Sequence, residues 1–305
     1  MPYKNKLVYL LERVLNSRSK KLTKQDEYMF YSPFVSHYKP KLQVNIVSQK
    51  WHCWVSNQGG HSLYSLFKKI NADGRYFSEL KDIVFVPTKK EKTESKIVVS
   101  LPSQYQPLWV KSKSLFYNHA ISFLKKRGLD GIDIKKYKIG FCDTGVYQNR
   151  IIIPSYDDNG ILNYFVGRSF MGGMKYKNPN VSRDIVPFDW FIAWSYPIVL
   201  CEGMFDAISI RTNAIPMLSK KPPKSLLRKI FEKKVKTIYI ALDEDAKKDA
   251  YNLSEFFKDF GIDTKVVNLP KDKDPNDLGF DKITDLINKT ISSSFSEMIQ
   301  AKIYG

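Results

Sequence analysis

Three acidic residues stand directly after two apolar runs in the C-terminal half of the chain. Glu202 follows PIVLC, and Asp243 and Asp245 follow TIYIAL. Carboxylates held close together repel each other by roughly 1 to 4 kcal/mol per pair. A hard divalent cation removes that repulsion, and oxygen-only ligands suit magnesium. The three residues therefore predict a metal-dependent site for phosphoryl or nucleotidyl transfer.

Further acidic residues stand near this set in the sequence pattern. Asp274 and Asp277 follow a third apolar run, TKVVNLP, and Asp206 lies four residues after Glu202. Asp274 is expected to join the metal ligands, with Asp206 and Asp277 as possible additions. The alternative for each residue is an ordinary acid at the start of a helix, where the helix dipole favours negative charge.

The elements that must position these acids follow from the apolar runs. Residues 197–202, 237–245 and 264–270 each predict a buried strand, and helical patterns separate them. Strand–helix–strand alternation predicts a parallel sheet with helices on its faces. In such sheets ligands bind outside the carboxyl ends of the strands, so we expect the acids to meet at one edge. Upstream, residues 120–129 predict a helix, and residues 150–170 predict two strands joined by a turn at 158–160.

The composition limits which classes of protein this chain can belong to. The chain has 305 residues, 43% of them hydrophobic, and a formal net charge of +18 from 49 basic and 31 acidic residues. This excess favours a polyanionic partner such as nucleic acid, the alternative being a basic protein without one. Three scattered cysteines argue against a disulfide framework and for a reducing compartment. The chain shows no signal peptide or membrane-length apolar stretch, so we expect a cytoplasmic protein without a membrane partner, in the host cytoplasm if phage-encoded.

Three segments around the acids resemble the Toprim fold. CEGMFDAISI (201–210) is similar to its E-G-x-x-D-A element, and ALDEDA (241–246) to its D-x-D element. DPND (274–277) is similar to the later D-P-x-D/E element of DnaG-type primases. Toprim domains also occur in topoisomerases, nucleases and recombination factors, so upstream segments must decide between these classes.

The upstream segments resemble the RNA polymerase domain of DnaG-type primases from tailed phages. AISFLKKRGLDGIDIKKYKIGFC (120–142), RIIIP, GILNYFVGRS and KYKNP follow the family's order, and the resemblance covers about residues 115–280. It implies that Glu202, Asp243 and Asp245 are catalytic and, with Asp274, hold Mg²⁺ or Mn²⁺. It also implies a basic face near the acids that binds ribonucleoside triphosphates and template, made of Arg150, Arg168, Lys175 and Lys177.

The N-terminal stretch 31–67 resembles the zinc ribbon of phage primases, but its ligand positions are substituted. They read Ser32, Val35, Cys53 and Ser56, and tetrahedral zinc needs four ligands, so zinc is not expected. A substitute site from His37, His52, His61 and Cys53 is disfavoured because adjacent strand residues point to opposite faces. Apolar packing is expected to replace part of the stabilisation that zinc would provide, from Phe30, Phe34, Trp51, Trp54 and Leu66.

The predicted architecture is α/β. A small zinc-ribbon-like β module for template recognition (1–70) is followed by a linker (71–112). An α+β basic subdomain (113–195) then forms the N-terminal part of the polymerase domain, before a Toprim-type parallel-sheet subdomain (196–295) and a tail (296–305). Within the linker, the charged run KKEKTESK (89–96) predicts a segment that is exposed to solvent.

The resemblance implies a DNA primase, a DNA-directed RNA polymerase that makes short RNA primers on single-stranded DNA. It further implies phage-type replication with the helicase as a separate chain. Two alternatives remain: a non-catalytic single-stranded DNA-binding replication factor, and another Toprim enzyme such as a nuclease.

Overall fold

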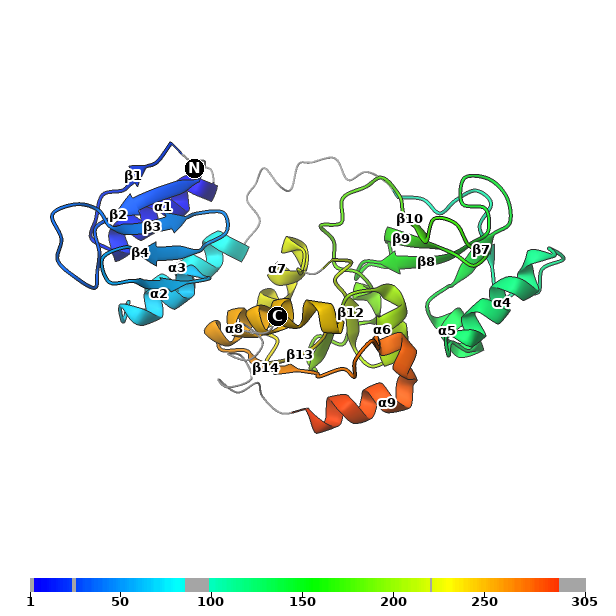
Figure 1. Cartoon of the computed structure of the whole chain (residues 1–305). Coiled ribbons are helices and arrows are strands. Elements are labelled where there is room, and N and C mark those ends of the chain that lie inside the picture. The colour runs from blue at the N-terminus through cyan, green and yellow to red at the C-terminus, as the bar shows by residue number, and fades with distance from the viewer. Residues whose placement is uncertain (1–2, 24–25, 86–98, 220, 291–305) are drawn as a thin grey trace. The chain divides into compact units, whose positions relative to one another are not determined.

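The computed structural model describes residues 3–23, 26–85, 99–219 and 221–290. The chain divides into two compact units, 1–95 and 96–305, each of which has its own sheets and core (Figure 1). The predicted solvated run 89–96 and the predicted tail lie outside the described residues. No helix in the described part of the chain is long and apolar enough to cross a membrane.

The N-terminal unit is an antiparallel five-stranded sheet in the order β1-β2-β3-β4-β5, covered by helices on one face. The strands are β1 (Lys20–Lys21), β2 (Glu27–Phe30), β3 (Leu42–Asn45), β4 (Trp51–Cys53) and β5 (Gln58–Gly60), and the helices are α1 (Tyr3–Val14), α2 (Leu63–Lys69) and α3 (Gly74–Phe85). Side chains of β3 and β4 alternate between the buried face and the open face, as a half-covered sheet requires.

The predicted linker 71–112 is wrong at residues 74–85 and 106–107, which belong to regular elements of the two units. Residues 74–85 form α3, whose Leu80 is fully buried in the core of the N-terminal unit. Arg13 on α1 fixes this helix through an ion pair to Glu79, at 2.9 Å between Nη1 and Oε1. Residues 106–107 form an edge strand of the second unit. The low apolar content of the segment concealed an amphipathic helix that needs only one face for the core.

The second unit contains two sheets that share a core. The first is antiparallel, in the order β10-β9-β8-β7-β6, and the second is parallel, in the order β12-β11-β13-β14. The antiparallel strands are β6 (Gln106–Pro107), β7 (Gly140–Cys142), β8 (Arg150–Tyr156), β9 (Leu162–Ser169) and β10 (Tyr176–Lys177). The parallel strands are β11 (Ile198–Cys201), β12 (Ala214–Pro216), β13 (Thr237–Ala241) and β14 (Asp263–Val266).

The helices of this unit pack against its two sheets. They are α4 (Phe116–Lys126), α5 (Gly131–Lys136), α6 (Met204–Ile210), α7 (Lys224–Glu232), α8 (Lys247–Asp259) and α9 (Pro275–Lys289), with single 3₁₀ turns η1 (Asp189–Phe191) and η2 (Glu244–Ala246). Residues of α6 and α9 join one core cluster, and residues of α7 and α8 join the other.

The central strand β11 contributes to both cores. Val199 and Cys201 belong to the cluster with α6 and α9, whereas Ile198 and Leu200 belong to the cluster with α7 and α8. A parallel strand covered on both faces reads as a continuous apolar run, which is why PIVLC shows no alternation. This confirms the predicted α/β fold with a parallel sheet.

The antiparallel sheet turns one face toward the same core. Its residues Phe141, Ile151 and Val166 lie in the cluster that also contains Cys201 and Ala241, the last residues of β11 and β13. The cross-strand partners Phe141–Ile151 and Ile153–Val166 define this inner face. The predicted basic subdomain therefore packs against the parallel sheet beneath the strand ends that carry the acids.

Candidate metal and nucleotide site

The parallel register brings the predicted acids to one edge. Cys201 pairs with Ala241, so β11 and β13 end side by side. Glu202 follows β11 at once, while Asp243 and Asp245 lie in the turn that carries the chain from β13 into α8. Residues about 40 positions apart in the sequence therefore lie next to each other in the structure.

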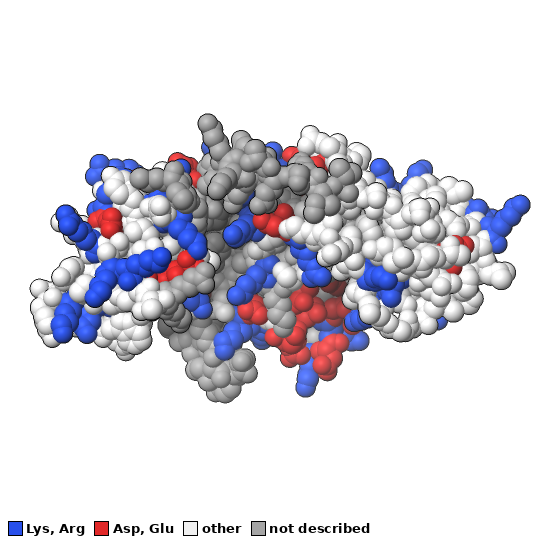
Figure 2. All heavy atoms as spheres, turned by 90° about the horizontal axis from the view of Figure 1, so that it is seen from above, with Lys and Arg blue, Asp and Glu red and all other residues white. Residues whose placement is uncertain are grey.

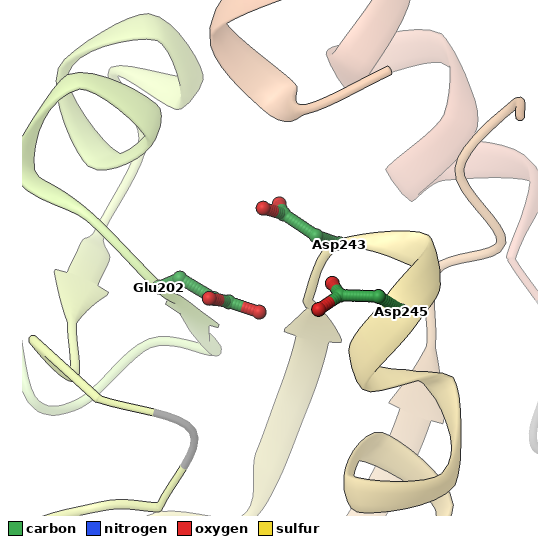
Figure 3. A group of neighbouring side chains, drawn as sticks. All are labelled: Glu202, Asp243 and Asp245. Carbon is green, nitrogen blue, oxygen red and sulfur yellow. The ribbon is translucent and has the colours of Figure 1, made fainter. Parts of the chain in front are cut away.

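The three carboxyl groups converge on a common space. Each of Glu202, Asp243 and Asp245 offers one oxygen, and these oxygens lie within 4.8 Å of one another. Figure 3 shows the Glu202 and Asp245 carboxylates pointing toward each other, with that of Asp243 directed into the space above them. Glu202 and Asp243 are half-buried and Asp245 is exposed, so the group is open to solvent on one side.

The surface around this site has mixed charge despite the basic sequence. Figure 2 shows Asp and Glu side chains of the second unit gathered in one area, with Lys and Arg side chains at its margin. Glu244 and Asp272 add to the acids there, because the Asp272 N–H donates to Glu244 Oε2 over 3.4 Å. A local concentration of negative charge on a cationic protein favours a bound cation at that place.

Asp206 is buried between the turn at Gly203 and the start of α9. Its carboxylate accepts the Gly203 N–H at 2.9 Å, next to Glu202, and the Asn276 N–H at the start of α9 is close enough to lower the pKa of Asp206. Burial, with the nearby charges of Asp274 and Asp243, raises its pKa to about 7. With its carboxylate held by the Gly203 N–H, Asp206 is placed to position the turn that carries Glu202.

Asp274 and Asp277 lie at the start of α9. The Asp274 carboxylate caps the helix by accepting the Asp277 N–H at 2.6 Å. Asp274 is close enough to Asp206 to raise the pKa of that residue. The group of three acids with converging oxygens does not include Asp274 or Asp277 among the described residues. Asp274 thus stands beside the site with one oxygen engaged as a helix cap, and Asp277 is exposed.

The four predicted basic residues do not share one face of their sheet. Arg168 pairs with Ile151 and Tyr176, which places it on the inner face. Arg150 pairs with Ser169, and Lys177 with Gly167, which places both on the outer face. Lys175 is exposed just before β10. The expectation of a single basic face is therefore wrong, because neighbouring positions on a strand alternate between its faces.

Arg168 has the features of an anion-binding side chain. Its guanidinium lies 4.7 Å from the centre of the Tyr176 ring. Its Nε and Nη1 are buried and have no hydrogen-bond partner in the described part of the chain. Buried donors without partners cost free energy, so this arginine is prepared for an acceptor that the protein itself does not supply.

The outer face carries a groove of about 500 Å³. It is lined by Tyr147 and Phe165 and by the loops 99–103 and 179–181. The Lys177 Nζ lies 5.9 Å from the centre of the Tyr147 ring. Arg150 reaches across the strand to the Gly167 carbonyl at 3.4 Å.

The four ribbon positions of the N-terminal unit lie together. The Cys53 thiol donates to Ser32 Oγ at 3.2 Å, and Ser32 Oγ accepts the N–H of Val35 at 3.2 Å. Burial raises the pKa of the Cys53 thiol, but hydrogen bonds from Ser32 and from the backbone of Ser56 outweigh it and hold the pKa below its usual value. Hydrogen bonds thus join Ser32 to Val35 and to Cys53, three of the four positions that the sequence predicts as substituted zinc ligands.

The expected packing of this unit is correct except at Trp54. Phe30, Trp51 and Leu66 are fully or almost fully buried, and Phe34 stacks on Trp51 at 5.7 Å. Trp54 is 62% exposed, and its Nε1 donates to Gln43 Oε1 at 2.9 Å. It lies on the open face of the sheet with His52, whose ring is 4.6 Å from its own, because side chains alternate between the two faces from Trp51 to Trp54.

Comparison with known proteins agrees with this site. Residues 199–279 match the Toprim-like family model, a range that begins in β11 and ends in α9 and contains every acid described above. The DNA primase of Campylobacter jejuni is 24% identical over 301 residues, covering 81% of this chain and 49% of that protein. The chain is thus similar in sequence to DNA primases. The DNA primase of Legionella pneumophila is likewise 24% identical over 307 residues, covering 81% of this chain and 52% of that protein.

Solved structures support the primase-type fold of the second unit. The DnaG primase catalytic domain bound to single-stranded DNA superposes with a TM-score of 0.53 at 16% identity, over 63% of this chain and 77% of that one. The RNA polymerase domain of Mycobacterium tuberculosis primase DnaG gives 0.52 at 18% identity, over 63% and 82%. The chain spans about half the length of the curated primases that it matches.

Proposed function

We propose that this chain is a DNA primase, which extends short RNA primers on single-stranded DNA by metal-dependent nucleotidyl transfer. The observation that carries the proposal is the convergence of Glu202, Asp243 and Asp245 at the carboxyl edge of a Toprim-type sheet. The relatedness of the chain to DNA primases over 81% of its length supports polymerisation over other Toprim reactions.

The donor set fits a hard divalent cation. Three carboxylates within 4.8 Å supply oxygen ligands only, without the sulfur or imidazole that selects zinc. We assign Glu202, Asp243 and Asp245 to Mg²⁺ or Mn²⁺, with Asp274 as a further ligand. Such a cation supplies charge stabilisation for the phosphoryl group undergoing transfer. Asp206 keeps the Glu202 turn in place, and Asp277 holds the cap that orients Asp274.

The basic residues on the two faces of the antiparallel sheet are proposed to bind different polyanions. Arg168, with Tyr176 and Lys175, is assigned to the triphosphate of the incoming ribonucleotide on the inner side. Arg150 and Lys177 are assigned to template phosphates on the outer side, where Tyr147 offers an aromatic surface. Arg and Lys contacts to phosphates make affinity dependent on salt, so both assignments imply binding that weakens as salt rises.

The decisive experiment supplies single-stranded DNA, four ribonucleotides with one labelled, and magnesium or manganese. We expect short labelled RNA that depends on the template, with a higher yield when a replicative helicase of the same replication system is added as a separate chain. Binding of DNA without RNA synthesis would favour the non-catalytic alternative. Cleavage or relaxation of plasmid DNA would favour another Toprim reaction.

Loss of Arg168 is expected to weaken nucleotide binding. An Arg168→Met substitution removes two buried donors together with their charge, while the methionine retains the contact with Tyr176. Charge-assisted hydrogen bonds contribute about 1.5–3 kcal/mol each, so the KM for ribonucleotides should rise roughly tenfold or more. Steady-state primer synthesis measures it, with the exposed Lys135→Met as a charge-matched control. An unchanged KM in Arg168→Met would remove Arg168 from the site.

The N-terminal unit is proposed to be a template-recognition module that folds without zinc. Cys53 offers one thiol, and hydrogen bonds join it to Ser32 and Ser56. We expect less than one-tenth of an equivalent of zinc by elemental analysis, and no loss of stability with a strong chelator. Structural zinc contributes roughly 10 kcal/mol or more of apparent folding free energy, so a zinc-dependent unit would unfold under the same treatment.

A further inference from the structure

Arg127, at the C-terminal end of α4, makes a reciprocal contact with Asn276 at the start of α9. Its Nη1 donates to Asn276 Oδ1 at 2.6 Å, and its backbone carbonyl accepts from Asn276 Nδ2 at 2.9 Å. The two residues are 149 positions apart in the sequence. This pair therefore ties the basic subdomain to the turn that contains Asp274.

Two aromatic rings hold the Arg127 guanidinium in place. Its central carbon lies 5.2 Å from the centre of the Phe123 ring and 4.9 Å from that of Phe205. Phe123 belongs to α4 and Phe205 to α6, so the guanidinium joins three helices. The planar guanidinium of arginine can stack on aromatic rings and at the same time donate hydrogen bonds in fixed directions, whereas the ammonium of lysine cannot.

Asn276 extends this contact toward the acidic site. It is 6% exposed, and its Nδ2 also donates to Ser209 Oγ on α6 at 2.7 Å. Its backbone N–H lies close to the buried Asp206 carboxylate, which accepts the Gly203 N–H beside Glu202. Hydrogen bonds thus join Arg127 to Asn276 and Asn276 to α6, and the start of α9 lies next to the carboxylate that holds the turn presenting Glu202.

We propose that Arg127 and Asn276 are positioning residues that set the metal affinity of the acidic site. They fix the start of α9 against α6, so that Asp274 and Asp206 keep their places beside Glu202 and Asp243. Neither residue touches the metal or the substrate. The inference rests on the proposed metal-dependent function. It gives Arg127, a cation of the basic subdomain, a role in placing the carboxylates at the edge of the parallel sheet.

An ion pair between the same parts of the fold provides a contrast. Arg211, at the end of α6, donates to Asp133 at 2.7 Å and to Asp130 at 3.0 Å near the start of α5. These contacts also tie the basic subdomain to α6, but they involve none of the acids of the site. An Arg211→Met variant therefore loses anchoring without disturbing the hydrogen bonds at the start of α9.

The test is the affinity of the whole chain for Mn²⁺ alone, measured by titration calorimetry and by electron paramagnetic resonance of free manganese. Partners behind the ligands of metal sites typically change affinity by 10- to 100-fold, so Arg127→Met and Asn276→Ala should each weaken binding about tenfold. Arg127→Lys should recover less than half of that loss. The exposed Lys126→Met, one position away, and Arg211→Met should bind within about twofold of the parent.

The outcomes separate this inference from the proposed function. Thermal unfolding identifies any variant that does not fold, and Arg127→Lys, which keeps the charge, then carries the comparison. Parent-like Mn²⁺ affinity in both Arg127 variants would overturn the inference, as would an equal loss in Arg211→Met. A parent that binds no manganese would overturn both proposals, whereas a parent that binds manganese and makes no RNA would overturn the proposed function alone.

Discussion

Asp243→Asn is expected to abolish primer synthesis while leaving the fold intact. The substitution keeps the size of the side chain but removes one of three converging negative charges, and with it one carboxylate of the proposed metal site. Removing one electrostatic contributor from a preorganised site typically costs about 100- to 1,000-fold in rate, and we expect a loss at the upper end of that range. Glu202→Gln should behave in the same way, because Glu202 faces the same space from the neighbouring strand.

The matched control for this prediction is Glu244→Gln. Glu244 lies between Asp243 and Asp245, and the substitution removes the same charge from the same turn. It does not belong to the group of converging acids among the described residues, so synthesis should fall less than about fivefold. Initial rates of labelled RNA synthesis across a range of magnesium concentrations give the comparison. Equal rates for the parent and Asp243→Asn at saturating magnesium would exclude the assigned role.

Asp206→Asn is expected to stabilise the metal-free protein at alkaline pH. Burial and the charges of Asp274 and Asp243 raise the pKa of Asp206 from 3.8 to about 7 in the folded chain. Between these values the folded protein holds a proton that the unfolded chain has lost. The free energy of unfolding therefore falls as pH rises through this window, by as much as about 1.4 kcal/mol per pH unit.

The expected difference has a definite sign and pH range. Asparagine cannot ionise, so the variant lacks this part of the pH dependence. At pH 8 its free energy of unfolding should exceed that of the parent by about 1 to 3 kcal/mol, less than the full linkage because the amide needs new partners. At pH 4 the advantage should vanish. Urea unfolding with chelator at pH 4, 6 and 8 measures it, and parallel profiles for the two proteins would contradict the raised pKa.

Magnesium should reverse the order at pH 8. A cation at Glu202, Asp243 and Asp245 offsets the negative charge that faces Asp206, and any ligand that binds only the folded state stabilises it. The parent should therefore gain more stability from magnesium than Asp206→Asn, in which the support of the Glu202 turn is altered. Equal gains would mean that Asp206 does not influence the metal site.

The sequence predicted the acids better than it predicted the cations around them. Glu202, Asp243 and Asp245 each follow a buried apolar run, and a parallel sheet has only one carboxyl edge, so their convergence followed from strand order. Arg150, Arg168 and Lys177 lie on antiparallel strands, where a shift of one position moves a side chain to the other face. The resemblance named these residues, but the pairing of Arg168 with Ile151 and Tyr176 was needed to separate them.

The sequence missed α3 and Trp54 for a related reason. GRYFSELKDIVF buries a single stripe, led by Leu80, against α1, and its overall polarity concealed that stripe. Trp54 belongs to an aromatic-rich segment that suggests core, yet it lies one residue beyond β4 and is mostly exposed. Trp54 shares the open face with His52, and which face of the sheet the helices cover is a property of the assembled unit.

The sequence by itself determined the chemistry of this protein: the carboxylates, the strands that carry them and the Toprim-type order of both. It did so because a strand buried on both faces must be apolar throughout, which marks the polar residue that follows it. Only the tertiary structure decided that Arg127 meets Asn276, and that the start of α9 lies beside the buried Asp206. Those contacts join segments up to 149 positions apart, and no local pattern records which distant segment a helix end will face.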